Sequence, residues 1–352
     1  MDQNIQRARQ LVVEAGLKLV KSGLIARTWG NISARVSDTQ FVVTPKGRGY
    51  ETLKPEDIVL LNIEDCSYKG DIKPSSEKGI HAAVYKLRKD INFVIHTHQL
   101  NASVLSVLGQ GIKVTKSDQD LLGDYVPNAA YGISSTKKLA KNAAKAIKDN
   151  PKSVVFLLRS HGAFSLGGTM EEAFNRAFVL EQAAEKEIYR LTDVSSLEEL
   201  RNKYIRQFVN EVNFTPKSFK NIRIPDDIVK FSKTNHIIYD DNPDVSAVSA
   251  NGKTFYPYID DVAQIIGVSI RNGKIEDALN NLKGRSAVLI QGAGALCVGV
   301  NEFEAQAVEM ILRKQCLCAM LVALTNIDKP LGTIDSWLQR LVYTHKYSKM
   351  KG

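Results

Sequence analysis

Apolar residues recur every three or four positions at the start of the chain. Ile5, Ala8, Val12, Ala15 and Leu19 form one stripe, which predicts a helix with a buried face. Later patterns predict strands over residues 41–44, 57–62, 92–95 and 154–158. They also predict four further helices. One begins near residue 77, one follows His98 and runs to about residue 108, and two cover residues 135–148 and 171–192. Residues 28–33 (TWGNIS) are expected to form a turn, and Ser76 to cap the helix that follows it.

The second half of the chain contains an echo of the first. VVFLLRSHGAFSLGGTMEEAFNRAFVLEQ aligns without gaps on SAVLIQGAGALCVGVNEFEAQAVEMILRK at a shift of 132 positions (293 minus 161). Leu157, Gly162, Ala163, Gly167, Glu172 and Ala173 recur as Leu289, Gly294, Ala295, Gly299, Glu304 and Ala305. Short strand–turn–helix units also resemble each other by chance, but the echo favours a duplication. Because Ala293 stands where His161 would recur, the chemistry is expected in the first half.

The length of 352 residues suggests two domains, at about 150 residues each. Residues 213–225 are polar and contain two prolines, so they are predicted to link a domain over 1–212 to a smaller one over 226–352. Hydrophobic residues make up 44% of the chain and charged residues 24%, which is a globular balance.

The charge and the cysteines restrict the possible partners and the compartment. The net charge of +9 is scattered over the chain, which argues against a nucleic-acid partner but suits an anionic phosphate ester. Four cysteines without zinc-finger spacing suggest reduced thiols and a cytoplasmic protein. The N-terminal residues do not resemble a signal peptide, and no apolar run approaches the ~20 residues of a membrane span, so no membrane partner is expected.

Three of the six histidines follow predicted strands. His96 and His98 end the strand over 92–95, and alternate residues of a strand point to the same side. His161 follows the strand over 154–158, so all three converge if the two strands share a sheet. Three imidazoles with one open position are typical of catalytic zinc. An H-x-H pair alone is more often a coincidence or a surface feature than a metal site.

Several polar residues are ordinary taken singly. Glu77 stands at a predicted helix start, where acidic residues are common because they complement the helix dipole. By itself it therefore indicates little about function. Ser75 and Ser76, with the amides of that helix start, could hold a phosphate, as could a glycine loop at Gly47 and Gly49. Asn31 is compatible with a simple turn.

Five motifs in order resemble the class II aldolase/adducin family. They are TWGNIS, VTPKGxGY, KPSSExxxH, VIHTH and LRSHG, and the resemblance covers about residues 5–190. The family includes fuculose-1-phosphate and rhamnulose-1-phosphate aldolases and ribulose-5-phosphate 4-epimerase. The resemblance implies an α/β fold, an α/β/α sandwich with a central, largely antiparallel sheet, followed here by a smaller degenerate α/β repeat without metal ligands.

The resemblance also implies roles for individual residues. His96, His98 and His161 match the metal ligands, for Zn2+ or another divalent ion such as Mn2+. Glu77 matches the catalytic base, while His81 is interpreted as structural. The phosphate-binding positions match Asn31, Gly47, Ser75 and Ser76, with Lys46 where the fuculose enzyme has threonine.

The implied activity is that of a metal-dependent aldehyde-lyase that cleaves a ketose-1-phosphate into dihydroxyacetone phosphate and an aldehyde. Two departures leave the reaction open: residues 109–118 contain no tyrosine, and Asn101 replaces a further histidine. A 4-epimerase, a dehydratase or a decarboxylase on the same fold, or a non-catalytic adducin-like scaffold, are the alternatives. Family enzymes form four-fold rings, so we expect a homo-oligomer, for example a dimer that builds a ring of pseudo-four-fold symmetry.

Overall fold

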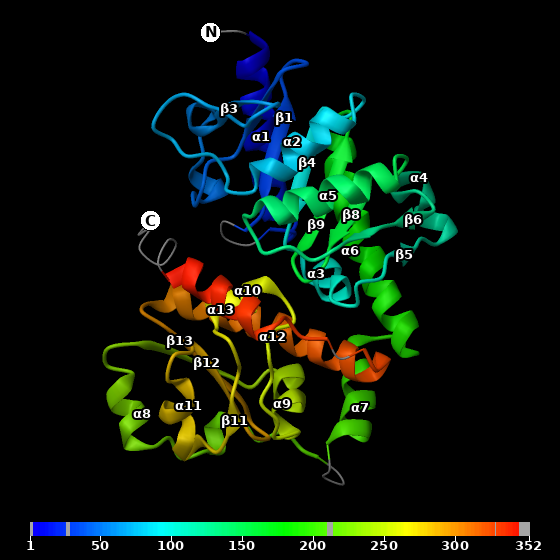
Figure 1. Cartoon of the computed structure of the whole chain (residues 1–352). Helices are drawn as coiled ribbons and strands as arrows, with labels where there is room; N and C mark the ends of the chain where they lie inside the picture. Colours follow the sequence, from blue (N-terminus) through cyan, green and yellow to red (C-terminus); the bar gives the residue numbers. More distant parts are fainter. Residues whose placement is uncertain (1–2, 26–28, 210–213, 328, 345–352) are drawn as a thin grey trace. The chain divides into compact units, whose positions relative to one another are not determined.

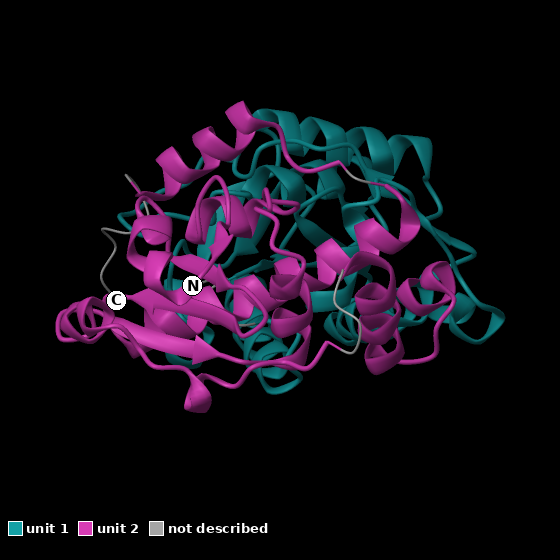
Figure 2. Ribbon diagram, turned by 90° about the horizontal axis from the view of Figure 1, so that it is seen from below, with its two compact units in different colours: residues 1–187, 350–352 teal, residues 188–349 magenta. Residues whose placement is uncertain are grey.

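The chain folds into two compact units (Figure 1). The first unit ends at Glu187 and the second begins at Ile188, inside one long helix (Figure 2). The computed structural model describes residues 3–25, 29–209, 214–327 and 329–344. Thr28 of the TWGNIS motif and residue 213 of the predicted linker therefore lie outside the described residues.

The first unit is built on a seven-stranded sheet with the order β3-β2-β1-β4-β9-β8-β7. Its strands are β1 (Asn31–Arg35), β2 (Gln40–Val43), β3 (Val59–Asn62), β4 (Phe93–Thr97), β7 (Asn128–Ala129), β8 (Val155–Leu158) and β9 (Gly162–Gly167). Neighbouring strands are antiparallel except for the parallel pair β7 and β8. The expected central, largely antiparallel sheet is confirmed.

Helices cover both faces of this sheet. One face carries α2 (Lys78–Leu87) and α5 (Lys137–Asp149), and the other carries α1 (Gln3–Lys21) and α6 (Met170–Thr192), with a separate apolar core on each side. The strands alternate between these cores: Ile95 faces α1 and α6, while Val94 faces α2 and α5. The smaller elements are α3 (Leu100–Ser106), α4 (Gln119–Leu122), β5 (Ile112–Lys113), β6 (Tyr125–Val126) and the 3-10 turns Tyr50–Thr52, Pro55–Asp57 and Lys116–Asp118. The α/β/α sandwich is confirmed.

Three details differ from the sequence prediction. Asn31, Ile32 and Ser33 were expected in a turn but belong to strand β1, because the polar side chains of Asn31 and Ser33 are buried against α2 while Ile32 packs in the core on the opposite face. Glu77, not Ser76, occupies the N-cap of α2. Strand β9 was not predicted, although it lies between β4 and β8 in the middle of the sheet.

The second unit contains a four-stranded sheet with the order β10-β13-β12-β11. Its strands are β10 (His236–Asp240), β11 (Asn272–Gly273), β12 (Ala287–Ile290) and β13 (Gly294–Gly299). Its helices are α7 (Leu197–Phe208), α8 (Asp226–Phe231), α9 (Pro243–Ala250), α10 (Asp260–Ile265), α11 (Ala278–Leu282), α12 (Glu302–Thr325) and α13 (Thr333–Val342), with 3-10 turns at Phe219–Asn221 and Ile275–Asp277. The expected additional α/β region is therefore present.

The two sheets repeat each other in register. β12 and β13 begin 132 residues after β8 and β9 (287 minus 155, and 294 minus 162), as the sequence echo predicts. The strand order β10-β13-β12-β11 matches β4-β9-β8-β7, and the last pair is parallel in both sheets. His96 lies opposite Phe164, and Tyr239 lies opposite Leu296, which is 132 positions after Phe164. This shared register supports a duplication.

The described part of the predicted linker, residues 214–225, packs onto the second unit. Phe219, Ile222 and Ile224 contact the apolar core formed by α8, α11 and the sheet. The boundary between the two compact units lies inside α6 instead, after residue 187. The domain boundaries at 212 and 226 stay a prediction.

The four cysteines are free thiols, of which Cys297, Cys316 and Cys318 are buried. Burial raises the pKa of each of these three thiols, so they pack as small core residues. Among the residues that the structure describes, none of the helices combines the length and the apolar character that crossing a bilayer requires.

Two glycines at equivalent positions should contribute to the stability of their units. A Cβ at Gly162 would lie 2.3 Å from the Thr97 carbonyl oxygen, and one at Gly294 would lie 2.1 Å from the Asp240 carbonyl oxygen. We expect Gly162→Ala and Gly294→Ala each to lower the free energy of unfolding of their own unit by about 1–3 kcal/mol. Urea unfolding measures this, with Trp29 reporting on the first unit and Trp337 on the second in single-tryptophan backgrounds.

Gly49→Ala is the matched control, because a Cβ there meets no atom within 4 Å. An unfolding midpoint for Gly162→Ala equal to that of the control would contradict the close approach of β9 to β4.

Candidate metal centre

Four side chains of the first unit form a compact cluster. Glu77, His96, His98 and His161 each offer a ligand atom, and these atoms all lie within 4.8 Å of one another. Glu77, His96 and His161 are buried, while His98 is half-buried and leaves the cluster one partly open side. The three histidines and the glutamate singled out in the sequence are therefore brought together, although they lie up to 84 positions apart (161 minus 77).

The sheet explains how the histidines meet. β4 and β9 are antiparallel, with Thr97 opposite Ala163, so the end of β4 meets the start of β9. His96 and His98 come from the first end, and His161 comes from the turn between β8 and β9. Ser160 adopts a left-handed conformation in this turn, with φ of 57°, which directs the chain into β9. Gly30 touches the same strand end, since a Cβ there would lie 2.5 Å from the His96 carbonyl oxygen.

The hydrogen bonds of His96 suit a metal ligand. Its Nδ1 lies 2.8 Å from the Ala163 carbonyl oxygen, so this nitrogen donates and Nε2 is left with its lone pair. His96 Nε2 lies 3.1 Å from His98 Nε2. Metal-binding histidines commonly donate their second N–H to a backbone carbonyl in this way. Ligands of a tetrahedral zinc ion stand about 3.4 Å apart, so the donor spacing fits such an ion.

The Glu77 carboxylate lies directly against the imidazoles. Its Oε2 is 3.1 Å from His96 Nε2, and its Oε1 is 3.1 Å from His161 Nε2. Burial alone would raise the pKa of Glu77, but the imidazoles of His161 and His96 hold that pKa well below its usual value. Glu77 is thus an ionised carboxylate in a buried site, a combination typical of a metal ligand or a proton acceptor.

His81 lies behind this carboxylate and does not join the cluster. Its Nδ1 is 2.6 Å from Ser33 Oγ, and its Nε2 is hydrogen-bonded to Asn31 Oδ1. Complete burial, with a further contribution from His96, lowers the pKa of His81 to about 3. His81 is therefore a neutral imidazole at physiological pH.

The residues predicted to bind phosphate lie on two segments that run side by side. The Lys46 N–H donates to the Lys73 carbonyl, and the Ser75 N–H donates to the Thr44 carbonyl. Gly47 has a φ of 70°, the left-handed conformation that glycine adopts at no steric cost. Lys46, Gly47, Ser75 and Ser76 are thus neighbours at the start of α2, while their role as anion ligands stays a prediction.

Two serines near the cluster were missed from the sequence. Ser134 Oγ lies 3.4 Å from Glu77 Oε1, and Ser135 Oγ donates to Ser76 Oγ at 2.8 Å. Ser135 also has a left-handed φ of 64°. Their loop lies 57 positions from Glu77 in the chain, and the sequence carries no signal for such a contact.

The corresponding place in the second unit has different chemistry. By register, Tyr239, Asp241 and Ala293 stand where His96, His98 and His161 stand in the first unit. The chain itself covers this place: the Lys217 N–H donates to the Gly292 carbonyl, and Ser218 Oγ lies 3.1 Å from Asp241 Oδ2.

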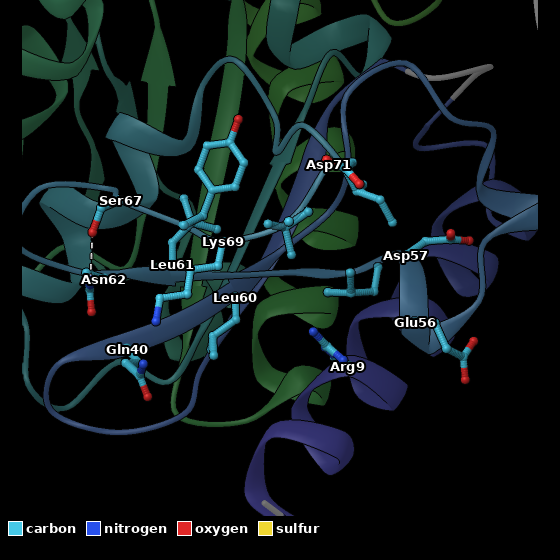
Figure 3. Close-up of a pocket in the computed structure, with 15 residues that line it drawn as sticks. Arg9, Gln40, Glu56, Asp57, Leu60, Leu61, Asn62, Ser67, Lys69 and Asp71 are labelled. Carbon is cyan, nitrogen blue, oxygen red and sulfur yellow. Dashed lines mark hydrogen bonds between the residues drawn. The ribbon is translucent and has the colours of Figure 1, made fainter. Parts of the chain in front are cut away.

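A separate cavity of about 530 Å3 runs along the outer side of β3 (Figure 3). Side chains of both charges line it, namely Arg9, Glu56, Asp57, Lys69 and Asp71, together with apolar residues of β3. It contains none of the predicted site residues. The chemistry indicated by the sequence is therefore concentrated at the Glu77 cluster.

Comparison with known proteins agrees with this geometry. Residues 10–188 match the family described as Class II Aldolase and Adducin N-terminal domain. The chain belongs to the class II aldolase and adducin family. The match ends next to the boundary of the first unit, at residue 187.

Two curated relatives of the family are named as aldolases. The 5-deoxy-D-ribulose 1-phosphate aldolase of Bacillus thuringiensis serovar kurstaki is 34% identical over 182 residues, which are 51% of this chain and 84% of that protein. The L-fuculose phosphate aldolase of Methanocaldococcus jannaschii is 30% identical over 174 residues, which are 49% of this chain and 92% of that protein. A solved L-fuculose 1-phosphate aldolase is 32% identical, with a TM-score of 0.49, and the match covers 55% of this chain and 92% of that one.

His81 should make the first unit sensitive to acid. Its folded pKa of about 3 is below its ordinary value of 6.5, so the unfolded chain binds a proton that the folded chain excludes. The stability linked to His81 is complete above pH 6.5 and is lost as the pH falls toward 3. We expect a loss of up to about 1.4 kcal/mol per pH unit in that window.

Urea unfolding of the metal-free protein, followed by Trp29 fluorescence, measures this dependence. His81→Gln cannot titrate and should have a shallower pH profile than the wild type. Parallel profiles between pH 6.5 and 4.5 would contradict the neutral, buried His81.

Proposed function

We propose that the chain is a metal-dependent aldehyde-lyase that cleaves a ketose-1-phosphate into dihydroxyacetone phosphate and an aldehyde. The observation that carries this proposal is the buried cluster of Glu77, His96, His98 and His161 in a member of the class II aldolase family. The two curated relatives, both named as phosphate aldolases, support it.

Glu77, His96, His98 and His161 would hold the divalent ion, Zn2+ or Mn2+. Three imidazoles with one carboxylate suit either metal. When bound, such an ion supplies Lewis-acid stabilisation of negative charge on a substrate oxygen, which contributes several kcal/mol in comparable enzymes. His98, as the half-buried member, lies on the side by which a substrate would approach.

Glu77 would move the proton of the reaction. It accepts the proton of the substrate hydroxyl, the neighbouring C–C bond breaks, and the hydroxyl carbon becomes the carbonyl of the aldehyde. The other fragment takes up one proton at carbon and leaves as dihydroxyacetone phosphate. Since Glu77 is ionised and buried, it is ready to accept that proton, and general-base catalysis contributes roughly 10²–10⁴-fold.

The phosphate would bind where the two paired segments meet. Gly47 and the amides at the start of α2 supply N–H groups, Ser75 and Ser76 supply hydroxyls, and Lys46 adds a positive charge. Binding at a part of the substrate that does not react positions the bond to be broken against Glu77. The loop with Ser134 and Ser135 lies beside both places.

Substitutions in the cluster test the assignment. We expect His96→Ala to lose both the metal and the cleavage activity, because it removes a ligand. The Ala163 carbonyl holds Nδ1 of this imidazole and so directs Nε2 into the cluster. We expect Glu77→Gln to weaken metal binding, because it removes the charge of one ligand, and at saturating metal to lower kcat by roughly 10²–10⁴-fold. The assay couples dihydroxyacetone phosphate to a dehydrogenase, with 5-deoxy-D-ribulose 1-phosphate and L-fuculose 1-phosphate as first substrates, and metal is counted by mass spectrometry.

His236→Ala is the matched control, since His236 lies in β10 of the second unit, outside the cluster. Unchanged metal content in His96→Ala would overturn the ligand set. Conversion of a sugar phosphate without dihydroxyacetone phosphate would instead indicate an epimerase, a dehydratase or a decarboxylase, and a protein that binds no metal would indicate an adducin-like scaffold.

We also propose that the chain forms a homo-oligomer, with a dimer as the simplest form. The repeat of four strands in the second unit supports this, since two chains would then supply four related sheets. Light scattering after size exclusion should give twice the mass of the chain, and a mass of one chain at micromolar concentration would refute the dimer.

A further inference from the structure

A ladder of hydrogen bonds runs from Glu77 into the core of the first unit. Glu77 at the N-cap of α2 and His81 and Tyr85 within α2 follow one another at intervals of four residues. Asn31 and Ser33 are two residues apart on one side of β1. The two rows interleave. Asn31 lies between Glu77 and His81, and Ser33 lies between His81 and Tyr85.

The bonds form one unbroken chain. Asn31 Nδ2 lies 3.1 Å from Glu77 Oε2, and Asn31 Oδ1 is hydrogen-bonded to His81 Nε2. His81 Nδ1 lies 2.6 Å from Ser33 Oγ, which lies 2.7 Å from the Tyr85 hydroxyl. All five side chains are buried, with Tyr85, Ser33 and His81 fully enclosed.

The ionised Glu77 determines the direction of every bond. A carboxylate only accepts, so Asn31 presents its NH2 group to Glu77 and its oxygen to His81. His81 must then donate through Nε2, which leaves Nδ1 as an acceptor for the Ser33 hydroxyl. Ser33 Oγ in turn accepts from the Tyr85 hydroxyl. One tautomer and one amide orientation satisfy the whole chain.

The far end of the ladder is held firmly. The Arg35 guanidinium lies 4.7 Å from the centre of the Tyr85 ring and donates to the carbonyl oxygens of Tyr85, Arg88 and Ile91. Phe41 packs against the same ring. The near end is Glu77 Oε2, the oxygen that also lies against His96.

We propose that Asn31, His81, Ser33 and Tyr85 form a positioning relay that fixes the orientation of the Glu77 carboxylate against His96 and His161. The inference rests on the proposed metal-dependent function. It gives the Asn31 side chain a place in this relay, with one N–H of its NH2 group directed at Glu77 and its oxygen directed at His81. It also gives His81 a positioning role in addition to a structural one.

Binding of Co2+ to the metal-free protein, followed by its visible absorption, tests the relay without any substrate. Ser33→Ala removes the donor to His81 Nδ1 and frees the tautomer. We expect a Co2+ affinity about 10-fold lower and an altered spectrum, the lower end of the effect of losing a group bonded directly to a ligand, because Ser33 acts on Glu77 through His81 and Asn31. The kcat should fall while KM for the sugar phosphate stays near the wild-type value, because the phosphate loops are untouched.

Two further variants separate orientation from packing. His81→Gln keeps a donor and an acceptor and should retain more Co2+ affinity than His81→Leu, which keeps neither. Tyr85→Phe keeps the ring and leaves the Ser33 hydroxyl free to donate to His81, so its effect should be smaller than that of Ser33→Ala. Ser106→Ala is the control, since it deletes another buried hydroxyl of the first unit, bonded to the Ser103 carbonyl.

Nitrogen NMR of the metal-free wild type provides an independent check, with the Nε2–H tautomer of His81 expected. The Nδ1–H tautomer, or Co2+ affinities and spectra of Ser33→Ala and His81→Leu equal to those of Ser106→Ala, would overturn the relay. Failure of the wild type to bind Co2+ at all would instead reject the proposed metal site, so the two failures are distinct.

Discussion

A carboxylate buried between two imidazoles is the interaction on which the first unit's chemistry depends. Removing a charged carboxylate from water costs several kcal/mol unless partners compensate. The Asn31 amide donates to Glu77 Oε2 and the Ser134 hydroxyl lies near Oε1, while His96 and His161 stand against the two oxygens. The sheet, the start of α2 and a distant loop must all be in place before this charge is tolerated.

This requirement links the fold to the site. Asn31 and Ser33 are polar residues inside a strand whose side chains bond to Glu77 and α2. α2 begins directly after Glu77, its N-cap. A buried polar network rigidifies a protein only when each member has its partner. The ladder from Tyr85 to Glu77 meets this condition, so the same bonds that hold α2 on the sheet also orient the carboxylate.

The second unit shares backbone geometry with the first unit but not its side-chain chemistry. It keeps the strand order, the register and the close glycine contact between β13 and β10. Tyr239, Asp241 and Ala293 replace the three histidines, and residues 217 and 218 bond across that place. Backbone geometry is therefore shared where side-chain chemistry is not, because strand pairing depends on alternation and on Gly294, whereas ligand chemistry depends on individual side chains.

The sequence by itself determined the helices with clear apolar stripes, the strands that lead to His96 and to His161, and the repeat at a shift of 132. Through five ordered motifs it also determined the family. These features are local or ordered along the chain, so spacing and motif order reveal them. Only the tertiary structure decided that β1 is a strand, that β9 lies beside β4 and brings His161 to His96, and that Ser134 touches Glu77. Those outcomes depend on pairings between distant segments and on buried polar contacts, and in the sequence a buried asparagine or serine is identical to one in an exposed turn.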